Sequence, residues 1–306
     1  MSSLNKILIC VLGPTASGKT SLAIRLAKHY KTEIISADSR QFYKEMQIGT
    51  AVPSVEELAS APHHFVQHKS IFEDYTVGDF EKDFLVKSEK LFKNHKYLIL
   101  VGGSGLYIDA AVKGLDNLPV KNEKIRKELE EKLNKEGIES LQKKLKGLDE
   151  EHYNQIDTQN PHRLIRSIEI LLQSDKKMLD LRTSVKPKRN FKTIYIGLNT
   201  DRDLLYERIN RRVDLMMQEG LLSEVKALEQ HKELNALNTV GYKELFSYLD
   251  NEISLDFAIS EIKKNTRRYA KRQLTWYRKN EQINWFDVHH DLNEIIKRID
   301  FFSKNT

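Results

Sequence analysis

The chain has 306 residues, of which 40% are hydrophobic and 31% are charged, and its net charge at pH 7 is +6. This length is enough to bury a large core and to divide in two. No stretch approaches the roughly 20 apolar residues of a membrane span, and the lone Cys10 excludes an internal disulfide. A core strand predicted from Lys6 leaves no room for a cleavable signal. We therefore expect a soluble, cytoplasmic protein, and the basic charge permits a polyanionic partner.

A glycine-rich loop near the N-terminus is the first chemical signal. Residues 6–12 predict a buried strand and residues 21–29 predict a helix. The loop between them turns its N–H groups toward phosphate oxygens, and the helix N-terminus adds positive charge. The usual ligand of such a loop is a nucleoside triphosphate such as ATP, and its Thr20 hydroxyl can bind Mg²⁺. The predicted phosphate-binding residues are Gly13, Pro14, Thr15, Ala16, Ser17, Gly18, Lys19 and Thr20.

Two further strands end in residues that bear on chemistry. Residues 32–36 predict a strand, and Asp38 stands just beyond its end, where open α/β sheets bind ligands. Position alone leaves Asp38 as a general base, a Mg²⁺ contact or a turn-capping residue. Residues 97–101 predict a central parallel strand. It ends in Gly102-Gly103 rather than in the acid of an ATPase, and we expect these glycines to let something large approach the backbone.

The middle of the chain has a different amino-acid composition. Residues 121–148 are dense in Lys and Glu, with apolar residues at helical spacing. Arg163 and Arg166 lie three residues apart and share a helix face, which is either a solvated surface or a grip on phosphates. We predict an α/β fold, a P-loop NTPase-like parallel sheet flanked by helices, with an all-helical insertion domain. The core is expected over 1–117 and 188–306, and the insertion over 118–187.

The C-terminal third is basic. Residues 192–198 predict a strand that returns to the sheet, and a long helix follows from residue 203 to 219. Tyr242 and Lys243 place a ring beside a cation, which suits stacking on a base next to a phosphate. The last long helix, predicted at 260–279, carries eight Lys and Arg residues with aromatic residues between them. This is the electrostatic footprint of nucleic-acid binding, and the alternative is a solvated basic face with core aromatics.

Taken together, these stretches resemble the tRNA dimethylallyltransferase family, also called tRNA isopentenyltransferases. The resemblance implies transfer of a dimethylallyl group from dimethylallyl diphosphate to N6 of the adenosine 3′ of the anticodon, in tRNAs that read UNN codons. It implies that the loop holds the donor's diphosphate, and that the insertion and the C-terminal helices clasp the anticodon stem-loop. We expect a monomer. The matching motifs, in the family's order, are 13–20, 36–41, 62–64, 101–107, 160–166, 240–243 and 270–276.

The resemblance also assigns roles to single residues. Asp38 matches the family's general base, and Arg212 matches an arginine that contacts the diphosphate. Ser104 stands where many members have Thr, and its hydroxyl would hold the adenine or orient Asp38. The backbone amides of residues 15–20 and Mg²⁺ at Thr20 would meet the charge of the leaving diphosphate. The tRNA-contact positions of the family correspond to Asp38, Ser39, Arg40, Gln41, Ser104, Arg126, His162, Arg163, Leu164, Ile165, Arg166, Asn238, Thr239, Val240, Gly241, Tyr242 and Lys243.

Three rival functions stay open from the sequence. A P-loop kinase for a small molecule shares the loop, the sheet and Mg²⁺, but it does not explain the basic terminal helix. An RNA-binding protein with a vestigial P-loop would need no general base. An adenylate isopentenyltransferase would use free nucleotide as the acceptor, whereas the insertion and the basic helix favour tRNA.

Overall fold

The computed structural model describes residues 6–174, 176–182 and 188–304, and the chain divides into two compact units. The core unit comprises Met1–Lys113 and Arg189–Thr306, and the insertion unit comprises Gly114–Lys188. The predicted insertion begins at 118, inside the insertion unit, and its predicted last residue, 187, lies outside the described residues.

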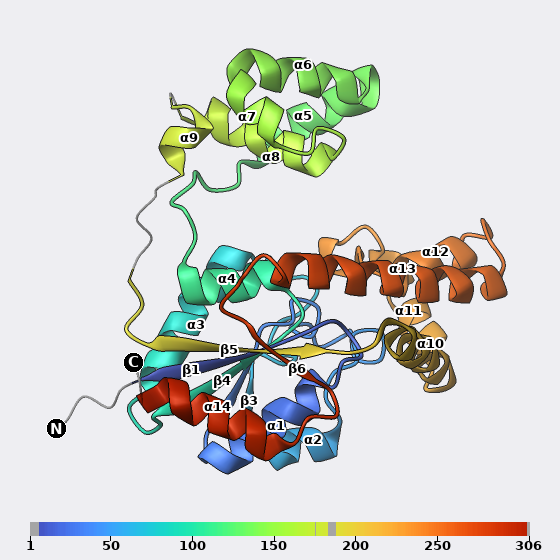
Figure 1. Ribbon diagram of the computed structural model, residues 1–306. Coiled ribbons are helices and arrows are strands. Elements are labelled where there is room, and N and C mark those ends of the chain that lie inside the picture. Colours follow the sequence, from blue (N-terminus) through green and yellow to red (C-terminus); the bar gives the residue numbers. More distant parts are fainter. Residues whose placement is uncertain (1–5, 175, 183–187, 305–306) are drawn as a thin grey trace. The chain divides into compact units, whose positions relative to one another are not determined.

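A parallel sheet organises the core unit (Figure 1). Its strands within the described residues run in the order β3-β2-β4-β1-β5-β6, and each neighbouring pair is parallel. All six residues of β1 are buried, as expected for a central strand covered on both faces. The predicted α/β fold is therefore confirmed. The strands are β1 (Ile7–Leu12), β2 (Ile34–Ser36), β3 (His63–His64), β4 (Tyr97–Val101), β5 (Lys192–Asn199) and β6 (Asn284–Asp287).

Helices cover both faces of this sheet (Figure 1). Alternate residues of β1 point to opposite sides, so Leu8 and Cys10 pack with α3 and α4, whereas Ile7 and Ile9 pack with α1 and α14. A further cluster around Val225 and its neighbours joins α10–α13. The helices of the core unit are α1 (Lys19–Tyr30), α2 (Val55–Ser60), α3 (Val77–Leu91), α4 (Gly105–Lys113), α10 (Arg202–Gln218), α11 (Leu221–Ala227), α12 (Tyr242–Leu249), α13 (Leu255–Tyr277) and α14 (Leu292–Lys304), with short 3₁₀ turns η1 (Glu229–His231) and η2 (Asn235–Leu237).

All the regular secondary structure in the described residues of the insertion unit is helical, and the unit has its own apolar core. The side chains of Leu129, Leu141, Leu145 and Leu164 lie in that core. Asn160 caps the start of α8, since its side chain accepts the N–H of Arg163 and a proline follows it. The helices are α5 (Glu123–Glu136), α6 (Ile138–Leu148), α7 (Glu150–Gln155), α8 (Pro161–Leu172) and α9 (Met178–Leu181).

The structure adds elements beyond the predicted end of the last helix. Strand β6 pairs with β5 at the edge of the sheet, and α14 packs Ile295 and Ile299 on the face that α1 also covers. The four residues of β6 are too few to show a period, whereas the apolar spacing of α14 was present in the sequence. In the described part of the chain, no helix combines the length and apolarity that a membrane crossing requires.

Candidate active site

The glycine-rich loop between β1 and α1 has an open helix N-terminus at its end. Gly18 adopts φ +82°, a left-handed conformation that glycine accepts without strain, and no side chain caps the helix there. Within the described residues, the N–H groups of Gly18, Lys19 and Thr20 have no acceptor, as expected for a first helical turn. These N–H groups and the helix dipole together suit an anion.

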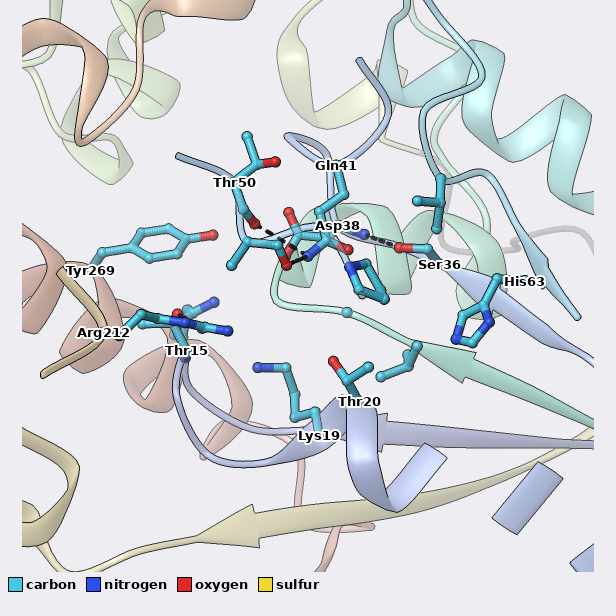
Figure 2. Close-up of a pocket in the computed structure, with 16 residues that line it drawn as sticks. Thr15, Lys19, Thr20, Ser36, Asp38, Gln41, Thr50, His63, Arg212 and Tyr269 are labelled. Carbon is cyan, nitrogen blue, oxygen red and sulfur yellow. Dashed lines mark hydrogen bonds between the residues drawn. The ribbon is translucent and has the colours of Figure 1, made fainter. Parts of the chain in front are cut away.

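Lys19 lies above this loop and supplies a full charge (Figure 2). Its Nζ donates to the carbonyl oxygen of Pro14 at 2.7 Å. Burial lowers the pKa of Lys19 to about 8, Asp38 opposes this change, and Arg212 adds to it. An incoming phosphate would relieve that burial cost, because it would give the ammonium a full counter-charge.

Arg212 comes from α10 and reaches the same loop. Its Nη1 donates to Oγ1 of Thr15 at 3.3 Å, and burial lowers its pKa without removing its charge. The backbone N–H of Thr15 does not face the cavity freely, because it donates to Oε1 of Gln273 at 2.8 Å. The N–H of Ser17 also donates inside the loop, to Pro14 at 3.3 Å. The expectation that all amides of residues 15–20 are free for phosphate was therefore wrong for these two.

Asp38 stands two residues beyond the end of β2, opposite the loop (Figure 2). Its Oδ1 accepts the backbone N–H of Arg40 at 3.2 Å, and its own N–H donates to Oγ of Ser36 at 3.3 Å. These contacts make it a partly buried carboxylate held by its own turn. The turn-capping interpretation thus describes its contacts, but the carboxylate also faces the cavity that contains Lys19 and Thr20.

Two adjoining cavities meet at Asp38. The first encloses about 620 Å³ of space open to solvent and contains the loop residues Thr15, Lys19 and Thr20. The second is also open to solvent, spans about 1,330 Å³ and extends along residues 238–241. Side chains that line both cavities belong to Thr15, Asp38, Thr50, Ala51, Arg212 and Tyr269. A phosphate-bearing ligand on one side and a larger acceptor on the other would meet at this carboxylate.

Ser104 holds the loop that carries Asp38. Its Oγ accepts the backbone N–H of Ser39 and donates to the Ser39 hydroxyl, both at 3.0 Å. Ser104 lines neither cavity. Of the two roles that the resemblance left open, these contacts favour orientation of Asp38 over direct contact with an adenine.

The glycines after β4 admit neighbouring parts of the chain rather than a ligand. A Cβ on Gly102 would lie 2.5 Å from the backbone of Ala37, and one on Gly103 would lie 2.4 Å from Nε2 of Gln273. A Cβ on Gly105 would lie 2.5 Å from the ring of Trp276. The expectation of a large group close to this backbone is thus met by the chain itself, so these glycines are no evidence about the ligand.

Arg40 and Gln41 shape the wall of the second cavity. The guanidinium of Arg40 donates to the carbonyl oxygens of Asn235, Ala236 and Asn238 at 3.0, 2.8 and 3.3 Å. Nε2 of Gln41 donates to the carbonyl oxygens of Thr50 and Ala51 at 3.2 and 2.8 Å. Both side chains therefore fix loops that line the cavities. Asn238, Thr239, Val240, Gly241 and Lys243 line the second cavity.

The stacking role predicted for Tyr242 is wrong. Its ring is fully buried in the core of α10–α13, and its hydroxyl donates to Oε1 of Glu224 at 2.6 Å. Glu224 also accepts the backbone N–H groups of residues 47–49 at 2.7 to 3.0 Å. Tyr242 therefore supports the loop that leads to Thr50, and the adjacent Lys243 is exposed.

In the insertion unit, two of the predicted tRNA-contact arginines share one carboxylate. The Glu169 side chain is fully buried and accepts Nε of Arg126 at 3.0 Å and Nη1 of Arg166 at 2.7 Å. Leu164 and Ile165 are buried in the apolar core, so only their backbone could reach a ligand. His162 and Arg163 are exposed. These residues lie in a different unit from Asp38.

The basic helix α13 contributes Tyr269, Gln273 and Arg272 to the two cavities, whereas Tyr277 lines neither. Tyr269, Gln273 and Tyr277 recur every four residues and share a face. Burial, followed by the charge of Asp38, raises the pKa of Tyr269 to about 12, and Tyr277 donates to the carbonyl oxygen of Gly102 at 3.3 Å. Sequence reasoning singled out the Lys and Arg residues of α13 and missed Gln273, although it lies inside the matching motif 270–276.

His63 and His64 differ in their contacts, because only His63 lines the first cavity, and its Nε2 has no hydrogen-bond partner in the part of the chain that the structure describes. Nδ1 of His63 lies 2.7 Å from the carbonyl oxygen of Ala61, and Nε2 of His64 lies 2.5 Å from Glu33. Across the described residues, no group of three or more His, Cys, Asp or Glu side chains is arranged to hold a metal ion.

Known proteins resemble this chain over nearly its full length. A family model described as IPP transferase matches residues 41–280. A tRNA dimethylallyltransferase of Christiangramia forsetii is 56% identical, over 97% of this chain and 98% of that protein. The tRNA dimethylallyltransferase of Flavobacterium johnsoniae is 55% identical, over 96% of this chain and 97% of that protein.

Solved structures give the same picture. The tRNA isopentenylpyrophosphate transferase of Bacillus halodurans has a TM-score of 0.71 and 37% identity, and the match covers 98% of this chain and 96% of that one. A eukaryotic dimethylallyltransferase described as acting on tRNA has a TM-score of 0.76 and 26% identity, over 92% of this chain and 74% of that one.

Proposed function

Since this chain belongs to the IPP transferase family, the tRNA dimethylallyltransferases, we propose that it transfers a dimethylallyl group from dimethylallyl diphosphate to tRNA. The acceptor is N6 of the adenosine 3′ of the anticodon in tRNAs that read UNN codons, and the second product is diphosphate. One observation carries the proposal beyond the family: the phosphate loop and the Asp38 carboxylate line the same cavity. We also propose that the chain acts as a monomer.

The loop side of the cavity handles the leaving group. As the allylic C–O bond breaks, negative charge grows on the diphosphate oxygens. Lys19, Arg212 and the free N–H groups at the start of α1 are fixed around the space where that charge develops. Preorganised donors of this kind stabilise a transition state more than a ground state.

Asp38 acts on the acceptor. The N6 lone pair of adenine is delocalised into the ring, which makes the amine a poor nucleophile. A carboxylate that takes the amine proton as the C–N bond forms lowers the barrier. Such general-base catalysis typically raises the rate by about 10²- to 10⁴-fold. Ser104 and Arg40 hold the turn of Asp38, so the carboxylate keeps its direction while the base enters.

Mg²⁺ is the proposed cofactor, and the residues present suit it. Mg²⁺ is usually bound by one or two protein oxygens together with substrate phosphates, which agrees with a cavity that offers the Thr20 hydroxyl beside the phosphate loop. When bound, Mg²⁺ would neutralise charge on the diphosphate. The Thr20 hydroxyl would hold it, while Lys19 and Arg212 contribute their own charges independently.

The anticodon stem-loop is the proposed RNA partner. The second cavity is open and is lined by residues 238–241, Lys243 and Arg272. The target base must leave the loop stack to reach Asp38, at a cost of a few kcal/mol. Exposed His162 and Arg163, with Arg126 and Arg166, form the proposed contact surface of the insertion unit.

Incubation of the purified protein with labelled dimethylallyl diphosphate, Mg²⁺ and a UNN-reading tRNA tests the proposal. Nucleoside mass spectrometry should find N6-(dimethylallyl)adenosine in that tRNA, and none in a transcript with guanosine at the target position. Modification of AMP but not tRNA would indicate an adenylate isopentenyltransferase. Transfer of phosphate from ATP to a small molecule, without any prenylation, would indicate a kinase.

A further inference from the structure

Gln273 joins the two loops that face each other across the cavity. Its Oε1 accepts the backbone N–H of Thr15 in the phosphate loop at 2.8 Å. Its Nε2 donates to the carbonyl oxygen of Gly103, beside Ser104, at 2.9 Å. The side chain is only 6% exposed, so both contacts are made largely away from water. A buried amide with both ends bonded in this way has one permitted orientation.

The surrounding backbone is shaped to admit this amide. A Cβ on Gly103 would lie 2.4 Å from Nε2 of Gln273, so a larger residue at 103 would displace the side chain. Gly103 is followed by Ser104, whose hydroxyl bonds Ser39 next to Asp38. A continuous series of contacts therefore runs from Thr15 through Gln273 to the turn that holds Asp38.

We propose that Gln273 is a positioning residue that fixes the phosphate loop and the Asp38 turn at one separation, so that donor and acceptor meet in reacting geometry. The inference rests on the proposed function for its substrates. Gln273 also lines the first cavity, and in this proposal it acts through its bonds to Thr15 and Gly103. Displacing reacting groups by about 1 Å can cost about 10²-fold in rate, which is the scale at which such a bridge matters.

Two substitutions separate this role from simple packing. Gln273→Met keeps the length of the side chain and removes both hydrogen bonds, so kcat should fall by about 10- to 100-fold while KM for tRNA stays unchanged. Tyr277→Phe is the matched control, because Tyr277 lies one turn further on α13, lines neither cavity and, in the described part of the chain, bonds only the carbonyl oxygen of Gly102. This control should keep its kcat even if its melting temperature falls.

Gln273→Glu gives a pH signature that a packing role would not produce. A protonated carboxyl group has the shape of the amide, with one oxygen to accept from Thr15 and one O–H to donate to Gly103. The ionised carboxylate cannot donate and would repel the Gly103 carbonyl. Activity of Gln273→Glu relative to wild type should therefore rise as pH falls, by up to about tenfold per pH unit, and Gln273→Met should show no such rise.

Two results would overturn the bridge: wild-type kcat in Gln273→Met, or parallel pH profiles for Gln273→Glu and wild type. If the wild-type chain fails to prenylate tRNA, the proposed function fails, and the bridge is judged by calorimetry with inorganic diphosphate. A loop that has lost its anchor must be ordered on binding, so Gln273→Met should bind diphosphate about tenfold more weakly than Tyr277→Phe. Equal affinities of Gln273→Met and Tyr277→Phe for diphosphate would then overturn the proposed bridge.

Discussion

Oδ1 of Asp38 accepts the backbone N–H of Arg40 at 3.2 Å, and no group in the described residues donates to Oδ2 of the same carboxylate. One oxygen thus fixes the direction of the side chain, and the other is available to take a proton. The side chain of Arg40 meanwhile donates to the carbonyl oxygens of residues 235, 236 and 238. The proposed base and the wall of the second cavity are therefore positioned by the same residue.

Asp38→Asn should remove the proton acceptor and leave the turn in place, because the amide oxygen can still accept from Arg40. We expect kcat to fall by about 10²- to 10⁴-fold, with the dissociation constant for tRNA unchanged. Single-turnover kinetics and a filter-binding assay measure the two quantities. Asp74→Asn, which alters an exposed carboxylate of the core unit, is the control. Full activity of Asp38→Asn would remove the general base from the mechanism.

Lys19 predicts a pH dependence of donor binding. Burial places its pKa at about 8, so the free protein loses the Lys19 proton as pH rises through that value. An anionic donor binds the protonated form better, and affinity should fall by about tenfold between pH 7 and pH 9. Calorimetry at both pH values measures this change. Lys19→Met removes the titrating side chain, so any pH dependence of affinity that remains comes from titration of the donor. An identical pH dependence in both proteins would exclude Lys19 as the source of the change.

The sequence predicted the features of the site that depend on local sequence pattern. Residues 13–20, between an apolar run and a helical period, predicted the loop, and Asp38 was correctly expected at the end of a strand. Tyr242 was misjudged because the same pattern of a ring beside a cation fits a surface and a core, and only the packing around Glu224 distinguishes them. Local sequence contains no information on that packing.

Gln273 shows a second limit of prediction from sequence, which concerns contacts between residues far apart in the chain. Its two partners lie 258 and 170 positions away in the chain, so no periodicity or spacing rule connects them. The glycines at 102 and 103 were a genuine signal of close approach, but the sequence could not say what approaches. The fold supplied Ala37 and Gln273 as the neighbours. Burial of polar side chains, rather than motif spacing, was the missing information.

Thr20 offers a test of the metal. Chelation of Mg²⁺ should abolish turnover, because the diphosphate charge would then be met only by Lys19, Arg212 and the N–H groups at the start of α1. Thr20→Val keeps the shape of the side chain without the hydroxyl, and the Mg²⁺ concentration for half-maximal activity should rise. Titration of Mg²⁺ against initial rate measures both effects. An unchanged Mg²⁺ requirement in Thr20→Val would place the ion elsewhere.

Glu169 predicts an acid-sensitive insertion unit. Burial raises its pKa, but hydrogen bonds from Arg126, Arg166 and the backbone N–H of Asn122 lower it by more, so the folded value lies below the ordinary 4.5. A carboxyl group whose pKa is lower in the folded state than in the unfolded state stabilises the fold at pH values above its unfolded-state pKa. This stability is lost as pH falls through its folded-state pKa. Hydrogen exchange of α5 and α8 should therefore accelerate below about pH 4.5, before that of β1.

Removal of the Glu169 charge should have the same effect at neutral pH. Glu169→Gln leaves two arginine heads without their counter-charge, which costs about 3–5 kcal/mol for a fully buried pair. Arg126 and Arg166 are 27% and 34% exposed, so we expect a smaller loss, about 2 kcal/mol, confined to the insertion unit. Hydrogen-exchange rates of α5 and α8, compared with those of β1, measure this loss of stability. Glu130→Gln, which changes an exposed residue of α5, is the control. Equal protection in both variants would mean that the arginines are held by contacts other than Glu169.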